Sequence, residues 1–323
     1  MQLEIWADVV CGWAYIGKRR LEKALTERGG EPVEVIWRPY RIDPTAPAAA
    51  VPLEEMLRDP IADASLRQCA PGLSPSENLT RISQIAADEG LGPRWGAAWR
   101  ANSHDAHRLL ALAHESGGAV LQDAVAEQVM KAHFIEALDI SDRTVLARVA
   151  EAAGFPAGPA LLAGSAGDSQ VRELMLIGRA SGVRTSPTFA VGGRLLAGAQ
   201  SPEVIREFLD AGDAEPTLPE EVRRLRQADA LLDLGDPLGT LTLLEPLLAT
   251  YGDDPNVQLV AARAYFASAQ LGRAERLLRL LVDRAPGDAY ARHLLGRTLQ
   301  RQGRGTEAVP HLRLTAAMAP DHG

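Results

Sequence analysis

The stretch that decides the fold is ADVVCGWAYIGKRRLEKAL, residues 7–25, in which a short apolar run reaches Cys11 and passes at once into a helical pattern. Apolar residues alternate through the run before it, at Leu3, Ile5, Ala7 and Val9. This period of two predicts a strand, and the helix that follows is predicted to end by Gly29-Gly30. A second alternating run, residues 33–38, completes a strand–helix–strand unit of the right length for a parallel pair.

Cys11 lies where the predicted strand gives way to the predicted helix. Unpaired backbone N–H groups at a helix N-terminus favour a thiolate, so the sequence predicts a functional thiol with a lowered pKa. Thiol-redox proteins carry a Cys-x-x-Cys pair at such a place. Here the second position of the pair is Ala14, so the motif lacks its own second thiol.

The pattern from about residue 52 to residue 180 is helical, and Trp95 and Trp99 are expected on one face of a helix that stops at Gly117-Gly118. Strand pattern then returns in PTFAVGGRLLAG, residues 187–198, as a hairpin that turns at its glycine pair. A final helix is predicted in residues 201–212, with Ser201 as its N-cap.

Pro187 stands immediately before the first strand of the hairpin. A trans proline there would obstruct strand pairing, so a cis Ser186–Pro187 bond is one interpretation.

Composition divides the chain near Gly212. The 323 residues are enough for about two domains. All five tryptophans and both cysteines precede this point, and the segment DAGDAEPTLPEE, residues 210–221, has the turn formers, prolines and acids of a linker. We therefore expect a domain over residues 1–212, a linker at 213–217 and a second domain over residues 218–321.

The second domain is predicted to be a helical repeat. Two of its stretches superpose at an offset of about 34 residues, so that Ala262 meets Gly296, Ala274 meets Ala308 and Pro286 meets Pro320. A weaker match precedes them. Small and apolar positions at this period are typical of tetratricopeptide helix pairs, which would recruit a peptide or protein partner. A generic α-hairpin domain is the alternative.

Composition also limits the partners. A net charge of −8 and a pI near 5.5 argue against nucleic acid or an anionic membrane surface. No secretory signal is visible at Met1, no apolar stretch approaches the roughly 20 residues that span a bilayer, and two cysteines make no disulfide framework. We expect a cytoplasmic protein with no membrane and no nucleic-acid partner.

Five stretches in order resemble the DsbA-like thioredoxin superfamily, and within it the FrnE-type branch. They are DVVCGWAYIGKRRLE, NSHDAHRLLALA, DISDRTVLARVAEAAG, SPTFAVGGRLLAGAQSPE and the helix between them, and they cover residues 1–212. Hydroxychromene-carboxylate isomerases and kappa-class glutathione transferases are relatives. The resemblance implies an α/β thioredoxin fold with a large helical insertion (about residues 52–180), followed here by the all-α repeat domain.

The same resemblance assigns the candidate site. Cys11 becomes the nucleophile, and a cis-proline loop at Ser186 and Pro187 packs across it and pairs with an extended substrate. His107, in the family's AHRL stretch, approaches the active-site face and is a candidate partner of the thiol. Trp13 and Ala14 become substrate-binding positions. The histidines at 104, 107 and 114 lack a metal-binding pattern, and no metal site is expected.

The departure from the family lies in Cys-Gly-Trp-Ala, where the usual motif is Cys-Pro-Trp-Cys. With Ala14 in place of the second cysteine, no local thiol can resolve a mixed disulfide. Nothing in the sequence places Cys69 close enough to do so.

Three functions stay open. The first is thiol–disulfide oxidoreductase or isomerase chemistry through a single cysteine. The second is a small-molecule isomerase or transferase that uses a non-covalently bound thiol such as glutathione or mycothiol. The third is a non-catalytic scaffold or chaperone.

Overall fold

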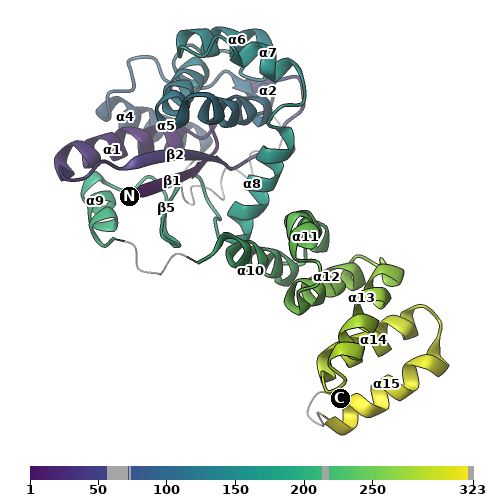
Figure 1. The fold of residues 1–323 in the computed structure, drawn as a ribbon. Coiled ribbons are helices and arrows are strands. Elements are labelled where there is room, and N and C mark those ends of the chain that lie inside the picture. The colour runs from purple at the N-terminus through teal and green to yellow at the C-terminus, as the bar shows by residue number, and fades with distance from the viewer. Residues whose placement is uncertain (57–71, 73, 213–217, 319–323) are drawn as a thin grey trace. The chain divides into compact units, whose positions relative to one another are not determined.

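The computed structural model describes residues 1–56, 72, 74–212 and 218–318. These residues form two compact units, one with the elements β1 to α9 and the other with α10 to α15 (Figure 1). The predicted linker at 213–217 and Cys69 lie outside the described residues.

A four-stranded mixed sheet forms the centre of the first unit. Its order is β2-β1-β5-β6, with bounds Glu34–Pro39, Gln2–Ala7, Thr188–Val191 and Arg194–Ala197. β1 pairs in parallel with β2 and antiparallel with β5, and α1 (Gly12–Arg28) connects the parallel pair. Gly192 and Gly193 turn the β5–β6 hairpin with φ of 53° and 83°. The predicted strand–helix–strand unit and the predicted hairpin are both confirmed.

The predicted helical block separates β2 from β5. Its described helices are α2 (Leu53–Met56), α4 (Pro75–Asp88), α5 (His104–Phe134), α6 (Arg143–Ala152), α7 (Gly158–Ala163) and α8 (Asp168–Ala180). The backbone of α5 leaves helical geometry at Gly117 and Gly118, as predicted. The closing helix α9 (Pro202–Asp210) has Ser201 as its N-cap.

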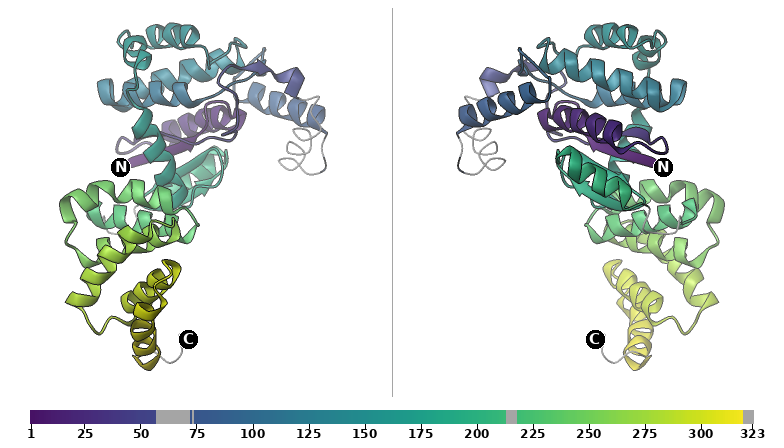
Figure 2. Two further views of the ribbon diagram at one scale, coloured as in Figure 1. Left: turned by 90° about the vertical axis from the view of Figure 1, so that its right-hand side faces the viewer. Right: turned by 90° about the vertical axis from the view of Figure 1, so that its left-hand side faces the viewer.

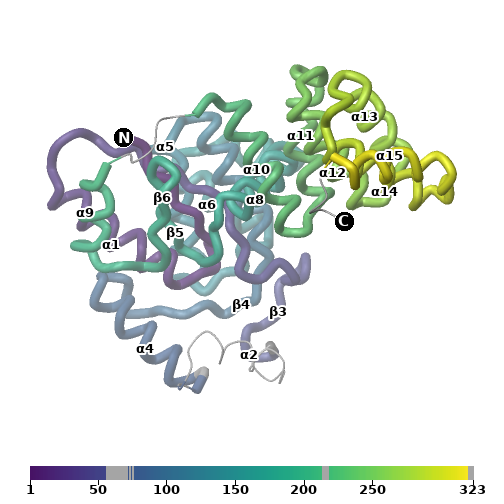
Figure 3. Tube along the Cα trace, turned by 90° about the horizontal axis from the view of Figure 1, so that it is seen from below, coloured from purple at the N-terminus to yellow at the C-terminus, as the bar shows by residue number. Residues whose placement is uncertain are grey.

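The block also contains a short β-ladder that the sequence pattern did not predict. β3 (Val51–Pro52) pairs antiparallel with β4 (Trp99–Arg100). Figure 3 labels both segments. The expectation that Trp95 and Trp99 share a helix is therefore wrong, because α5 begins only at His104. Pro93 cannot donate a helical hydrogen bond, and Gly96 adopts a φ of 141°, which a helix excludes.

Helices cover both faces of β1. Leu3 and Ile5 are buried on the side of α1, which also packs against α9. Trp6, on the opposite face, is 3% exposed because α8 covers it. Gly178 of α8 allows this close approach, since a Cβ there would lie 2.5 Å from the Trp6 ring. Figure 2 shows α5, α1 and α9 in successive layers of this unit.

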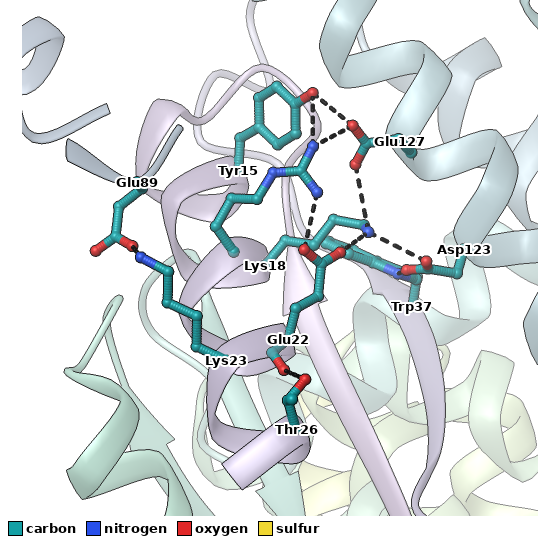
Figure 4. A network of polar contacts seen from close by, with 10 residues as sticks. Tyr15, Lys18, Glu22, Lys23, Thr26, Trp37, Glu89, Asp123 and Glu127 are labelled. Atoms are coloured by element: carbon teal, nitrogen blue, oxygen red, sulfur yellow. Dashed lines mark hydrogen bonds and ion pairs between the residues drawn. The ribbon is translucent and has the colours of Figure 1, made fainter. Parts of the chain in front are cut away.

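An ionic network attaches α1 to α5. Lys18, whose side chain is 5% exposed, lies 3.1 Å from Asp123 and 3.3 Å from Glu127 and also pairs with Glu22 (Figure 4). Burial disfavours the charged amine, but the three carboxylates outweigh it and raise the pKa of Lys18. Trp37 of β2 donates its indole N–H to Asp123 at 2.9 Å. The network therefore fixes α1, and with it Cys11, relative to α5 and the sheet.

The second unit is a stack of helical hairpins. Its helices are α10 (Glu220–Asp233), α11 (Pro237–Tyr251), α12 (Pro255–Ala267), α13 (Leu271–Arg284), α14 (Ala289–Arg301) and α15 (Gly305–Met318). The small residues that defined the repeat lie at the close contacts: Ala262, Ala274 and Ala308 are fully buried, and a Cβ at Gly296 would lie 2.7 Å from Leu312. Among the described helices, none has the length and apolarity to cross a membrane.

The contact between Gly178 and Trp6 gives a test of the fold. Gly178→Ala should destabilise the first unit by about 1–3 kcal/mol, because the new methyl group overlaps a ring that α8 and the sheet hold in place. Urea unfolding followed by tryptophan fluorescence measures the change. The matched control is Gly164→Ala, whose Cβ would have no neighbour closer than 4.0 Å. Equal stability of Gly178→Ala and the wild type would contradict this packing.

Candidate functional site

Cys11 is the N-cap residue of α1, as the sequence predicts. Its backbone N–H donates to the carbonyl of Asp8 at 3.0 Å, and its own carbonyl accepts from Ala14 N–H at 2.9 Å. The residue is 7% exposed. Its thiol donates a hydrogen bond to the backbone carbonyl of Ser186, with Sγ 3.4 Å from the oxygen. The first turn of α1 thus directs the sulfur at the loop that precedes β5.

That loop carries the predicted cis bond between Ser186 and Pro187. Pro187 packs against Gly17 of α1, where a Cβ would lie 3.0 Å from the proline ring. The Pro187 carbonyl accepts from Gly198 N–H at 2.7 Å, which ties the loop to the end of the hairpin. Cys11, Ser186 and Pro187 are therefore brought together as the sequence predicts, although they are distant in the chain.

Asp8 is a member of this site that the sequence analysis missed. It is 1% exposed, and its backbone N–H donates to the Ser186 hydroxyl at 2.9 Å. Its carboxylate accepts from Ile42 N–H at 2.7 Å and from Val10 N–H at 3.4 Å. One feature of the sequence could have identified Asp8 as a site residue. It is an acid three residues before the cysteine, within an otherwise apolar run.

His107 lies beside Asp8, and its predicted pairing with the thiol is replaced by a contact with that carboxylate. The ring Nε2 is 3.3 Å from Asp8 Oδ1, and the side chain is 2% exposed. Asp8 thus stands between the imidazole and the residues that hold the sulfur.

Aromatic rings form one wall beside the thiol. A Cβ at Gly12 would lie 3.2 Å from the Trp95 ring, and Trp95 stacks on Phe134 with centroids 4.8 Å apart. Trp13 is half-buried against the same core. The side chain of Ala14 is fully buried, so its predicted contact with substrate is wrong. The backbone N–H of Ala14 instead donates to the carbonyl of Cys11, and its methyl group faces the core.

Burial decides the protonation of Cys11. Desolvation raises the pKa of the thiol, and the negative charge of Asp8 acts in the same direction. Hydrogen bonds from Ser186 and from the backbone of Ala14 and Trp13 lower the pKa but are outweighed. The expected low pKa is therefore wrong, because the favourable helix N-terminus lies in a largely buried site. Across the described ranges, no group of three or more His, Cys, Asp and Glu could hold a metal ion.

A second buried histidine faces Asp8. His133 of α5 is 2% exposed, its Nδ1 has no hydrogen-bond partner, and burial lowers its pKa to about 4 although Asp8 and Asp139 oppose this. It is neutral at pH 7.

Alkylation kinetics test the protonation state of the Cys11 thiol. Because burial raises the pKa of Cys11, alkylation by iodoacetamide should report an apparent pKa above the ordinary ~8.5 of a cysteine. Peptide-resolved mass spectrometry over a pH series separates Cys11 from Cys69. An apparent pKa below that value would show that the helix N-terminus dominates.

The buried neutral imidazole of His133 makes the stability of the first unit depend on pH. His133 takes up a proton on unfolding between its unfolded pKa of ~6.5 and its folded pKa of about 4. Neutral His133 therefore makes its full contribution to the free energy of unfolding above pH 6.5. This contribution is lost as the pH falls from about 6.5 to about 4, at about 1.4 kcal/mol per pH unit. The free energy of unfolding of His133→Gln should fall less steeply than that of the wild type from pH 6.5 to pH 4. Parallel slopes would contradict a buried neutral imidazole.

Comparisons with known proteins agree with this geometry. The family model of the DsbA-like thioredoxin domain matches residues 2–210, and that of the tetratricopeptide repeat matches residues 231–298. The uncharacterized protein YwbO of Bacillus subtilis is 22% identical over 212 residues, which are 65% of this chain and 96% of YwbO.

Two solved structures are also similar to this chain. A probable DsbA oxidoreductase of Streptomyces coelicolor is 28% identical, with a TM-score of 0.54 over 68% of this chain and 93% of that one. The cytosolic disulfide reductase DsbM of Pseudomonas aeruginosa is 21% identical, with a TM-score of 0.42 over 65% of this chain and 98% of its own.

The matched region holds the sheet, the helical insertion, Cys11 and the Ser186–Pro187 loop, and it spans most of the first unit. The chain therefore belongs to the DsbA-like thioredoxin domain family, and tetratricopeptide repeats follow this domain.

Proposed function

We propose that this protein is a FrnE-type thiol–disulfide oxidoreductase or isomerase that works in the cytoplasm through Cys11 alone. The contact between the Cys11 thiol and the Ser186 carbonyl is the observation that carries the proposal. It places the sulfur beside a loop whose main chain can pair with an extended substrate.

The proposed reaction needs no second thiol in the motif. The Cys11 thiolate attacks one sulfur of a substrate disulfide, forms a mixed disulfide and releases the other sulfur as a thiolate. An external thiolate then attacks the mixed disulfide, takes over the substrate sulfur and restores the Cys11 thiolate. The net change is disulfide exchange, so the electrons balance without a further oxidant or reductant.

The external thiol is proposed to be a low-molecular-weight thiol such as glutathione or mycothiol. Ala14 supports this assignment, since its methyl group fills a fully buried position where a resolving thiol would stand. Ser186 and Pro187 are proposed to orient the substrate, and half-buried Trp13 to contact it. The repeats, residues 218–321, are proposed to recruit a peptide or protein partner.

A second candidate is an isomerase or transferase that acts on a small molecule with a bound thiol cofactor. The observation in its favour is the resting state of Cys11, which is a protonated hydrogen-bond donor. A neutral S–H group could donate to the thiolate of a cofactor and need not attack anything itself.

Incubation with glutathione disulfide tests the proposal. At alkaline pH the wild type should gain one glutathione on Cys11, detected by mass spectrometry after acid quenching, and added free thiol should remove it. Cys11→Ser should gain none at position 11. Ala14→Cys, which supplies a local resolving thiol, should convert the adduct into an internal disulfide.

Turnover separates the alternatives. The wild type should catalyse exchange between glutathione and hydroxyethyl disulfide, and Cys11→Ser should not. An adduct without turnover would contradict the proposed exchange cycle. Equal behaviour of the wild type and Cys11→Ser in both assays would overturn thiol chemistry and favour a scaffold.

A further inference from the structure

The outer edge of the sheet belongs to β2, and only part of this edge is covered. β2 is the last strand of the order β2-β1-β5-β6, so β1 pairs with one of its two sides. On the other side, Trp37 donates its backbone N–H to Gln122 Oε1 and accepts from Gln122 Nε2, both at 2.9 Å. The amide of Gln122 thus takes the place of the peptide group of a further strand.

Val35 points its main-chain groups to the same side as Trp37. The N–H and C=O of one strand residue face one neighbour, and those of the next residue face the other. Glu34 donates its N–H to the carbonyl of Met1, in the direction of β1, so Val35 faces the free side. Among the described residues, neither main-chain group of Val35 has a hydrogen-bond partner. Such an edge is a template for another extended chain.

A groove of about 910 Å³ lies along this part of the edge. Apolar side chains from the sheet, α1 and α5 line it, namely Ile5, Leu21, Leu25, Val33, Val35 and Val120. Gly117 and Gly118 also line it, at the place where the backbone of α5 leaves helical geometry. Val120 is 85% exposed, so an apolar surface beside the free edge is open to a partner.

The charged side chains of the groove favour a basic partner. They are the acids Glu22, Glu34 and Asp123 and the base Lys18. Lys18 is 5% exposed and already pairs with Glu22 and Asp123 (Figure 4). The side chains of these two acids are 43% and 41% exposed. The accessible charge beside the groove is therefore negative.

An extended chain fits these features, whereas a helix does not. A helix uses its main-chain groups internally and would leave those of Val35 without partners. A strand offers both an N–H and a C=O to Val35, and its alternate side chains all point to one face. Val35 lies opposite Leu3, which is on the side of α1, so the side chains on that face of an added strand would enter the groove.

We propose that the edge of β2 at Val35 binds an extended segment of a partner protein, with apolar residues at alternate positions and Lys or Arg beside them. Gln122 limits the site to the first half of β2, because it already occupies Trp37. The site lies at the amino ends of β1 and β2, whereas Cys11 follows the carboxyl end of β1. The proposal therefore goes beyond the thiol chemistry and does not depend on it.

Amide exchange followed by NMR on the isotope-labelled full chain tests the edge directly. In the free protein the Val35 amide should exchange faster than the Trp37 amide, which is bonded to Gln122. The probe is the peptide Lys-Val-Thr-Val-Lys, blocked at both ends. Saturating peptide should slow exchange at Val35 and leave Trp37 unchanged. Alkylation of Cys11 beforehand should not alter the Kd, because the two sites lie at opposite ends of β1.

Val35→Pro tests the main-chain contact. Proline removes the N–H that faces outward and leaves the pairing with β1, which uses Glu34 and Ile36, in place. The Kd of the peptide should rise about tenfold, as expected for one lost hydrogen bond. Val35→Ala is the matched variant, since it shortens the same side chain but keeps the N–H, and its Kd should rise less. Urea unfolding checks that both variants are folded.

Val120→Lys tests the groove without touching the strand. The new charge lies at an exposed position, so the fold should be kept, and binding of the basic peptide should weaken severalfold. Leu79→Lys is the control, because Leu79 of α4 is also exposed but does not line the groove. A peptide with Glu in place of both Lys residues should bind the wild type more weakly and Val120→Lys more tightly.

Three outcomes would overturn the proposal. The first is no protection of Val35 at any peptide concentration. The second is an equal Kd for the wild type, Val35→Pro and Val120→Lys, which places the peptide elsewhere. The third is protection of Val35 without peptide that increases with protein concentration, which assigns the edge to a second copy of the chain. The glutathione disulfide assay uses no peptide, so the proposed function succeeds or fails separately.

Discussion

Ser186 joins the two halves of the first unit at the point where chemistry is proposed. Its hydroxyl accepts the N–H of Asp8 and its carbonyl accepts the thiol of Cys11, across sequence separations of 178 and 175 residues. Bonds over such separations form only when the sheet has assembled in the order β2-β1-β5-β6. The site is thus a consequence of the antiparallel pairing of β1 with β5, and it cannot persist in either half alone.

Two electrostatic effects compete at Cys11, and their balance sets the resting state. The N-terminus of α1 supplies N–H groups that favour a thiolate, as in any helix. Desolvation favours the neutral thiol and prevails, because the residue is 7% exposed and Asp8 adds a negative charge nearby. Under the proposed function, a nucleophile held in this way is stored in an unreactive form until water or a substrate reaches it.

The predictions that succeeded rested on local rules. Alternation in residues 2–7, the glycine pair of the β5–β6 hairpin and the Ser201 cap each follow from the chemistry of a few neighbouring residues. The helix proposed around Trp95 and Trp99 failed because helical spacing of apolar residues also occurs in irregular chain that packs on a core. Pro93 and Gly96 were the local signals against it.

The sequence alone determined where the thiol stands, which strands flank it, that Ala14 removes the second sulfur, and that the chain continues into helical repeats. Each of these features depends on a few neighbouring residues or on a regular spacing of residue types along the chain. Only the tertiary structure decided that Asp8 is buried beside His107, that Ala14 faces the core, and that Cys11 is protonated at rest. The physical reason is that burial and long-range charge depend on which distant segments exclude water from a site, and no local pattern records this.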